Sequence, residues 1–248
     1  MKIYAGFFKN TLYLYPADVY VVVDVLRFST TVSVALDLGV REIHVYADLS
    51  QAVAAAEELK APLIAEVEGF KPAEADLDNS PTEVIKYFSA KTPEKAVIRT
   101  TSGALIIEEA VKKRLKDVVV GGIINADVVA TYLSKTSIKS ITIAMAGYKR
   151  SMFAIDDLLG AGAIIAELAE RVSNLELMTD EAVVAYELYV KARREGRIEE
   201  LVKSGRAGKF LVETGRSADA EYSARPNIIH VIPRLKPGTR SVIRAQIE

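Results

Sequence analysis

Short continuous apolar runs alternate with longer stretches of helical periodicity over residues 1–172. An apolar run of about four to eight residues predicts a strand buried on both faces, and apolar positions recurring about every three to four residues predict an amphipathic helix. Because the connections are short, the alternation predicts a three-layer α/β/α fold with a mostly parallel central sheet. The expected strands are residues 2–8, 19–25, 42–46, 62–66, 96–99, 118–122 and 140–146, and the expected helices are residues 28–38, 49–60, 81–89, 103–115, 126–134 and 154–172.

Both ends of the chain depart from this alternation. Residues 2–8 and 12–15 flank a polar turn, which predicts a hairpin at an edge of the sheet. No linker rich in Pro, Gly or Ser interrupts the chain, so we interpret residues 1–248 as a single α/β domain, with residues 173–248 as a helical extension that ends in strands. In this extension we expect helices at residues 180–194 and 198–203, a helical turn at 209–212, and strands at 227–231 and 241–247.

One apolar run ends in a dense polar cluster. Residues 19–23 lead into Asp24 and Arg27, and three hydroxyl residues follow at 29–31. Open α/β sheets hold ligands at the carboxyl ends of their strands, and the amino end of the following helix attracts anions. We therefore expect a site for a phosphorylated ligand with a metal ion. The alternative is an ordinary Asp at a strand end followed by a helix cap.

Two further segments share this design, in which small polar residues lie between a strand and a helix. They are residues 100–103 and 121–125, and in a parallel sheet they lie at the same edge as Asp24. Glu66 ends another strand, and an acidic pair at 156–157 begins a long helix. Carboxylates near an anion site repel the ligand unless a divalent cation bridges them, although the pair at 156–157 would equally serve as a helix cap.

The composition limits the classes of partner and the kinds of metal ion that the protein is expected to bind. Lys and Arg total 32 against 33 Asp and Glu, so no basic excess indicates nucleic acid. No apolar run reaches the length of a membrane span and no signal peptide is recognisable, which predicts a cytoplasmic protein. Because the chain has no Cys and two His, a bound metal would be held mainly by oxygen, which favours Mg²⁺, Ca²⁺ or Mn²⁺.

Short polar motifs follow one another in a fixed order from about residue 19 to residue 162. They are Asp24-Val25-Leu26-Arg27, Thr30-Thr31, Asn79-Ser80-Pro81, Thr100-Thr101, Asn125, Ala146-Gly147, Asp157 and Ala161-Gly162. Their order and spacing together resemble the 2-phosphosulfolactate phosphatase family. The resemblance implies a three-layer α/β fold and magnesium-dependent hydrolysis of a phosphate ester of sulfolactate, a step of coenzyme M biosynthesis.

The resemblance also implies roles for individual residues. Asp24, Glu66 and Asp157 would bind Mg²⁺, and Arg27 would hold the phosphoryl group bidentately. Asp24 and Arg27 are thus the expected catalytic residues, with the role of Asp24 as nucleophile or as metal ligand alone left open. The expected substrate-binding residues, which would donate to the phosphoryl group or orient a sulfonate or carboxylate, are Arg27, Thr30, Thr31, Asn79, Ser80, Thr100, Thr101, Ser102, Gly103 and Asn125.

Five positions differ from the family pattern, namely Ala65, Asp78, Ser102, Ala104 and Asp156. These differences motivate two alternatives, a different phosphate ester as substrate and a non-catalytic member that binds an anionic metabolite. An aspartyl-phosphate phosphatase of the haloacid dehalogenase type is a third, although Leu26 occupies the place where that class has a second Asp. The expected partners are a small phosphorylated substrate and a second copy of the chain in a homodimer.

Overall fold

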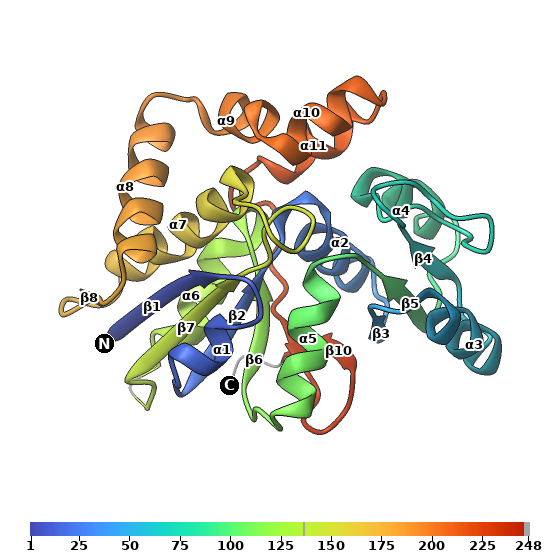
Figure 1. Ribbon diagram of the computed structural model, residues 1–248, viewed down its shortest axis with the longest axis horizontal. Helices are drawn as coiled ribbons and strands as arrows, with labels where there is room; N and C mark the ends of the chain where they lie inside the picture. The colour runs from blue at the N-terminus through green and yellow to red at the C-terminus, as the bar shows by residue number, and fades with distance from the viewer. Residues whose placement is uncertain (136, 246–248) are drawn as a thin grey trace.

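The computed structural model describes residues 1–135 and 137–245, and it confirms the predicted α/β fold in three layers (Figure 1). The strands are β1 (Lys2–Phe7), β2 (Val19–Val23), β3 (Glu42–Tyr46), β4 (Leu63–Ala65), β5 (Lys95–Arg99), β6 (Val118–Gly121), β7 (Ser140–Met145), β8 (Glu176–Leu177), β9 (Pro233–Leu235) and β10 (Ser241–Arg244). They form one mostly parallel sheet in the order β4-β5-β3-β10-β9-β6-β2-β7-β1-β8.

Helices cover both faces of this sheet. The helical segments are α1 (Thr11–Leu14), η1 (Val25–Ser29), α2 (Thr30–Asp37), α3 (Leu49–Leu59), α4 (Pro81–Phe88), α5 (Gly103–Lys112), η2 (Ile123–Asn125), α6 (Ala126–Leu133), α7 (Ile155–Ala169), α8 (Asp180–Arg194), α9 (Ile198–Ser204), α10 (Arg206–Glu213) and α11 (Ser217–Ser223). One face of the sheet packs against α6 and α7, with α8 outside α7, and the other face packs against α2, α4 and α5.

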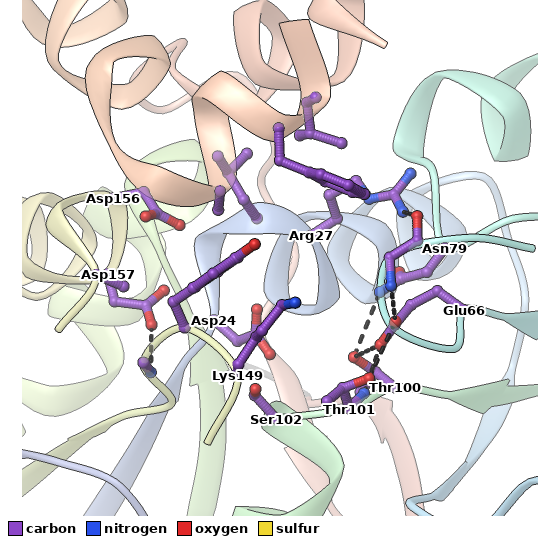
Figure 2. Close-up of a pocket in the computed structure, with 18 of the residues that line it drawn as sticks. Asp24, Arg27, Glu66, Asn79, Thr100, Thr101, Ser102, Lys149, Asp156 and Asp157 are labelled. Carbon is purple, nitrogen blue, oxygen red and sulfur yellow. Dashed lines mark hydrogen bonds between the residues drawn. The ribbon is translucent and has the colours of Figure 1, made fainter. Parts of the chain in front are cut away.

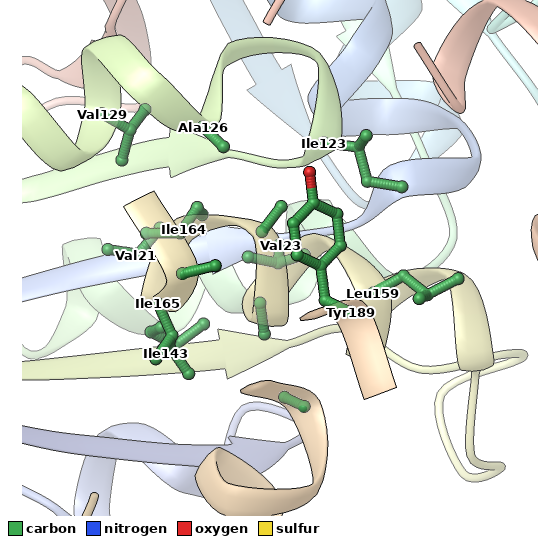
Figure 3. Close-up of a cluster of buried hydrophobic side chains, with 14 of the residues drawn as sticks. Val21, Val23, Ile123, Ala126, Val129, Ile143, Leu159, Ile164, Ile165 and Tyr189 are labelled. Atoms are coloured by element: carbon green, nitrogen blue, oxygen red, sulfur yellow. The ribbon is translucent and has the colours of Figure 1, made fainter. Parts of the chain in front are cut away.

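Strand β2 shows why the apolar runs fold as buried strands. Its alternate residues Val21 and Val23 belong to the core on the α7 side, whereas Val22 belongs to the core on the α2 side. A strand buried on both faces needs apolar residues at successive positions, so its sequence shows no alternation. Figure 3 shows Val21 and Val23 beside Ile164 of α7, with the Tyr189 ring of α8 in the same cluster.

The two parallel parts of the sheet run in opposite senses. Three antiparallel pairings lie between β3 and β6, formed by β3 with β10, β10 with β9, and β9 with β6. Because three is an odd number of reversals, strands β4, β5 and β3 run in the direction opposite to that of strands β6, β2, β7, β1 and β8. A flat sheet would place their carboxyl ends at opposite edges, yet the Gly103 N–H after β5 lies 2.8 Å from the Asp24 carboxylate after β2. Strand twist between the groups therefore brings the two sets of ends together.

The amino-terminal hairpin prediction is wrong. Residues 11–14 form the short helix α1, and β1 pairs in parallel with β7 on one side and β8 on the other. Because both sides of β1 are occupied, a returning antiparallel strand has no edge to pair with. The carboxyl-terminal strand expected at residues 227–231 is also wrong, since that segment has no strand and β9 begins at Pro233.

The remaining elements lie close to their predicted places. Helix α10 is longer than the turn expected at residues 209–212, and α11 was not predicted. The expected last strand is present as β10, within the part of 241–247 that the structure describes. None of the described helices combines the length and the apolar character needed to cross a membrane.

Candidate active site

A pocket lies where the chain leaves β2 and β7 and where it leaves β4 and β5 (Figure 2). The loop that begins at Gly147 and residues of α10 complete its wall. Its lining residues are Asp24, Leu26, Arg27, Glu66, Glu68, Gly69, Asn79, Thr100, Thr101, Ser102, Gly147, Tyr148, Lys149, Ala154, Asp156, Asp157, Ala207, Phe210 and Leu211.

The structure brings most of the predicted site residues into this pocket. Those that line it are Asp24, Arg27, Glu66, Asn79, Thr100, Thr101, Ser102 and Asp157. The predicted residues outside its lining are Thr30, Thr31, Ser80, Gly103 and Asn125. The roles assigned to all of them stay predictions, while their contacts show what each side chain does in the fold.

Asp24 is a buried carboxylate at the end of β2. Its Oδ2 accepts the backbone N–H of Gly103, at the start of α5, over 2.8 Å. Burial raises the pKa of Asp24 to about 7, and the negative charges of Asp156 and Glu66 add to the effect. A Cβ on Gly103 would lie 2.7 Å from Asp24 Oδ2 and 2.6 Å from the Phe28 ring, so the contact requires glycine. Gly103 therefore acts by its N–H and by its lack of a side chain.

Two adjacent carboxylates at the start of α7 have different surroundings. Asp157 accepts the Val25 N–H at Oδ1 and the Gly147 N–H at Oδ2, and so ties the loops after β2 and β7 together. Asp156 keeps Oδ1 buried and without a hydrogen-bond partner among the described residues. Burial raises the pKa of Asp156 to about 6 and that of Asp157 well above its usual range. Asp156 is thus the carboxylate of the pair with an oxygen available to a ligand.

Glu66 uses both carboxylate oxygens to join β4 to the segment after β5. Oε1 accepts the hydroxyl of Thr100 and the N–H of Thr101, and Oε2 accepts the Thr101 hydroxyl at 3.0 Å and the Gly69 N–H at 2.8 Å. Four donors on one carboxylate fix its orientation. This network fixes the shape of the pocket wall opposite Asp24.

Arg27 lies against the pocket with its guanidinium directed away from the Asp24 side. Nη1 donates to Asp78 at 2.8 Å and to Asp219 at 3.0 Å, and Nη2 donates to Asp78 at 3.2 Å. The Arg27 side chain is 4% exposed, and its partners are 10% and 1% exposed. A bidentate grip on a phosphoryl group would require these buried pairs to open.

Three of the predicted residues outside the lining, Asn125, Thr30 and Ser80, form hydrogen bonds that serve the fold. Asn125 caps the turn after β6, since its Oδ1 accepts the Gly122 N–H and its Nδ2 donates to the Val231 carbonyl. Thr30 donates to the Val25 carbonyl, and Ser80 accepts the Glu83 N–H at the start of α4. The Thr31 hydroxyl is buried without a partner in the described structure. A small polar residue after a strand suits a helix cap as well as a ligand.

The pocket carries an excess of negative charge. Its described lining contains five carboxylates, at residues 24, 66, 68, 156 and 157, against the two cations Arg27 and Lys149. Among the described residues no three Asp, Glu or His side chains come together to hold a metal ion by themselves. The assignment of Asp24, Glu66 and Asp157 as metal ligands stays a prediction. Asp156 lies close enough to Asp24 for its charge to raise the pKa of Asp24, and its Oδ1 has no partner among the described residues, so this pair of carboxylates suits an oxygen-binding cation such as Mg²⁺.

Several pocket residues were not predicted from the sequence. Asp156 adjoins the predicted Asp157, and helical position alone does not say which of the two keeps an oxygen free of hydrogen bonds within the described structure. Lys149 and Tyr148 belong to a loop, and Phe210 belongs to a helix far along the chain. The one signal in the sequence was the doubled acid at residues 156–157.

Comparison with known proteins gives a consistent result. A family model described as 2-phosphosulpholactate phosphatase matches residues 9–238. A protein of Carboxydothermus hydrogenoformans named "Probable 2-phosphosulfolactate phosphatase" is 32% identical over 234 residues, which is 94% of this chain and 92% of that protein. Proteins of the same name from Deinococcus radiodurans and a Synechocystis species are 31% and 28% identical, over 90% and 89% of this chain and 90% of each relative.

Proposed function

Because the chain belongs to the 2-phosphosulpholactate phosphatase family, a family of phosphoric monoester hydrolases, we propose that it hydrolyses 2-phosphosulfolactate to sulfolactate and phosphate with Mg²⁺ as cofactor. The match of the family model over residues 9–238 carries the proposal, since that span contains every lining residue of the pocket. The same residues bring carboxylates and helix-start donors together, as metal-assisted phosphate chemistry requires.

The unpartnered Asp156 Oδ1 supports the choice of metal. A buried carboxylate oxygen without a donor is costly, and a cation held between Asp156 and Asp24 would remove that cost. The bound ion would polarise the phosphoryl group and lower the pKa of a coordinated water. It would also offset the excess of carboxylates in the pocket, which otherwise repels an anionic ester.

The chain's own groups divide the remaining tasks. The Gly103 N–H holds one oxygen of Asp24, which fixes the direction of this carboxylate. The segment at Thr101 and Ser102 leads into α5, whose amino end favours the phosphoryl oxygens. Phe210 and Leu211 of α10 supply apolar surface on another side of the pocket and limit the water that reaches the ester.

Release of inorganic phosphate tests the proposal. Wild-type protein should release phosphate from 2-phosphosulfolactate in the presence of Mg²⁺, and chelation by EDTA should reduce the rate by at least about 100-fold. A panel of small phosphate esters, assayed in parallel, identifies the preferred substrate. Absence of release from every ester by folded protein would refute the proposal.

Thermal stability should depend jointly on pH and Mg²⁺. The pKa values of Asp24 and Asp156 are raised to about 7 and about 6, so the folded state binds protons more tightly than the unfolded state. The stability these protons provide is complete below about pH 4 and is lost as pH rises through 6 to 7. Without metal, Tm should fall by roughly 5 °C between pH 5 and pH 8 through these groups.

Mg²⁺ binds the ionised carboxylates and should reverse that loss, so it should raise Tm more at pH 8 than at pH 5. Differential scanning calorimetry at matched ionic strength separates the effect of Mg²⁺ binding on Tm from the general screening of charges by salt. Asp156→Asn serves as the control, since it should reduce the Mg²⁺ effect at pH 8. An equal Mg²⁺ effect at both pH values would contradict this assignment of the metal.

A further inference from the structure

The two cations that line the pocket are held in very different ways. Arg27 is nearly fully buried between Asp78 and Asp219. Opening such a buried pair is expensive because it leaves charges without partners in a medium of low polarity. Lys149 is paired with Glu68 at 3.5 Å, and these side chains are 48% and 54% exposed. An exposed ion pair of this kind contributes little to stability, so another anion can readily replace Glu68 beside Lys149.

The loop conformation directs Lys149 toward the substrate space. Gly147, Lys149 and Arg150 all have positive φ, at 72°, 49° and 67°, so the chain turns sharply just after β7. Figure 2 shows the Lys149 side chain extending into the space between Asp24 and the cluster formed by Glu66 and Thr101. Its neighbour Arg150 pairs with the same Glu68 at 3.5 Å but does not line the pocket. Lys149 is therefore the lining cation that an incoming anion can reach.

We propose that Lys149 is the specificity-determining residue that binds the substrate's second anionic group, a carboxylate or sulfonate carried beside the phosphate ester, and that this group displaces Glu68. The inference rests on the proposed function, because a phosphate ester of sulfolactate carries such groups. A cation held by Asp24 and Asp156, as proposed above, would take the phosphoryl group, so a separate cation is needed for the rest of a multiply charged ester. Before substrate binds, Glu68 forms the ion pair with Lys149.

Kinetics of Lys149→Met with three esters test the proposal. The esters are 2-phosphosulfolactate, 2-phospholactate without the sulfonate, and isopropyl phosphate with neither second anion. For 2-phosphosulfolactate, KM should rise about 10- to 100-fold with kcat changed less than about 3-fold, as expected for loss of one charged hydrogen bond. Isopropyl phosphate should show no change. The response of 2-phospholactate distinguishes a bound carboxylate from a bound sulfonate, and either supports the proposal.

Matched variants separate this role from a structural one. Arg150→Met removes the other partner of Glu68 in the same loop and should change KM less than about 3-fold, whereas Lys149→Arg should restore most of the affinity. Glu68→Gln removes the competing anion and should lower KM about 2- to 3-fold. Equal losses by Lys149→Met on all three esters, or a fall in kcat alone, would overturn the proposal.

Calorimetric titration of 2-phosphosulfolactate gives a readout that does not depend on turnover. Wild type should bind the ester about 10- to 100-fold more tightly than Lys149→Met, measured with Ca²⁺ in place of Mg²⁺. Binding that depends on Lys149 without phosphate release would refute the proposed function and leave this inference standing. Phosphate release together with binding that does not depend on Lys149 would refute this inference and leave the proposed function standing.

Discussion

The Asp24→Asn variant is expected to hydrolyse 2-phosphosulfolactate at least about 10³-fold more slowly than wild type. The carboxylate lies in the pocket, and Gly103 N–H fixes its Oδ2 at 2.8 Å. An amide of the same shape keeps the hydrogen-bond acceptor and loses the negative charge. A cation between residues 24 and 156 would then lose one of its two charged protein ligands. Steady-state phosphate release at saturating Mg²⁺ measures the loss.

The stability of the folded Asp24→Asn variant shows whether its loss of activity comes from the site or from unfolding. Burial and the neighbouring charges of Asp156 and Glu66 raise the pKa of Asp24, so its ionised form destabilises the metal-free fold at neutral pH. Asp24→Asn should therefore be at least as stable as wild type at pH 8 without Mg²⁺, despite its loss of activity.

Glu109→Gln is a matched variant, because Glu109 is also a buried carboxylate with an unpartnered oxygen but lies outside the pocket lining. It should retain activity within about 3-fold. Retention of more than a tenth of wild-type activity by Asp24→Asn would contradict the role assigned to Asp24.

The strands and most helices could be predicted because their signals are local. Residues 19–23 are all buried, so an uninterrupted apolar run is what the fold requires there. Helix α4 begins as expected, with Ser80 accepting the Glu83 N–H and Pro81 in the first turn. The order of the strands is not local information. Strands β9 and β10 lie in the interior of the sheet between β3 and β6, and their short sequences do not specify these partners.

The site was predictable in its location but not in its internal pairing. Asp24 was identified because a polar residue that ends a buried strand lies at the ligand-binding edge. The partners of Arg27 could not be identified, since Asp78 is 51 residues away and Asp219 is 192 residues away in an unpredicted helix. Likewise, the different surroundings of Asp156 and Asp157 arise from the way α7 packs against the loops after β2 and β7. Long-range packing decides which polar side chains remain available to a ligand.

Arg27→Met should reduce the free energy of unfolding by about 3–5 kcal/mol, because it removes the cation from a buried cluster of two carboxylates. Asp78 would keep Arg216 at 3.1 Å, and Asp219 would keep the hydroxyls of Ser80 and Thr82 at 2.7 and 2.6 Å. Asp219, which is 1% exposed, would thus retain hydrogen bonds but lose its cation among the described residues. Urea unfolding measures the change, and Tm should fall by about 10 °C.

Comparison with a matched pair and with a double variant distinguishes this structural role from the phosphate-binding role predicted for Arg27. Arg41→Met breaks the exposed pair with Glu94, at 3.7 Å, and should cost less than about 1 kcal/mol. Adding Asp219→Asn to Arg27→Met should recover part of the loss, because the unpaired charge is then removed as well. If Arg27 served chiefly to hold the phosphoryl group, its replacement would abolish activity while leaving stability near that of wild type. From the buried pairs with Asp78 and Asp219 we expect instead that the fold itself weakens and that any loss of activity accompanies that weakening.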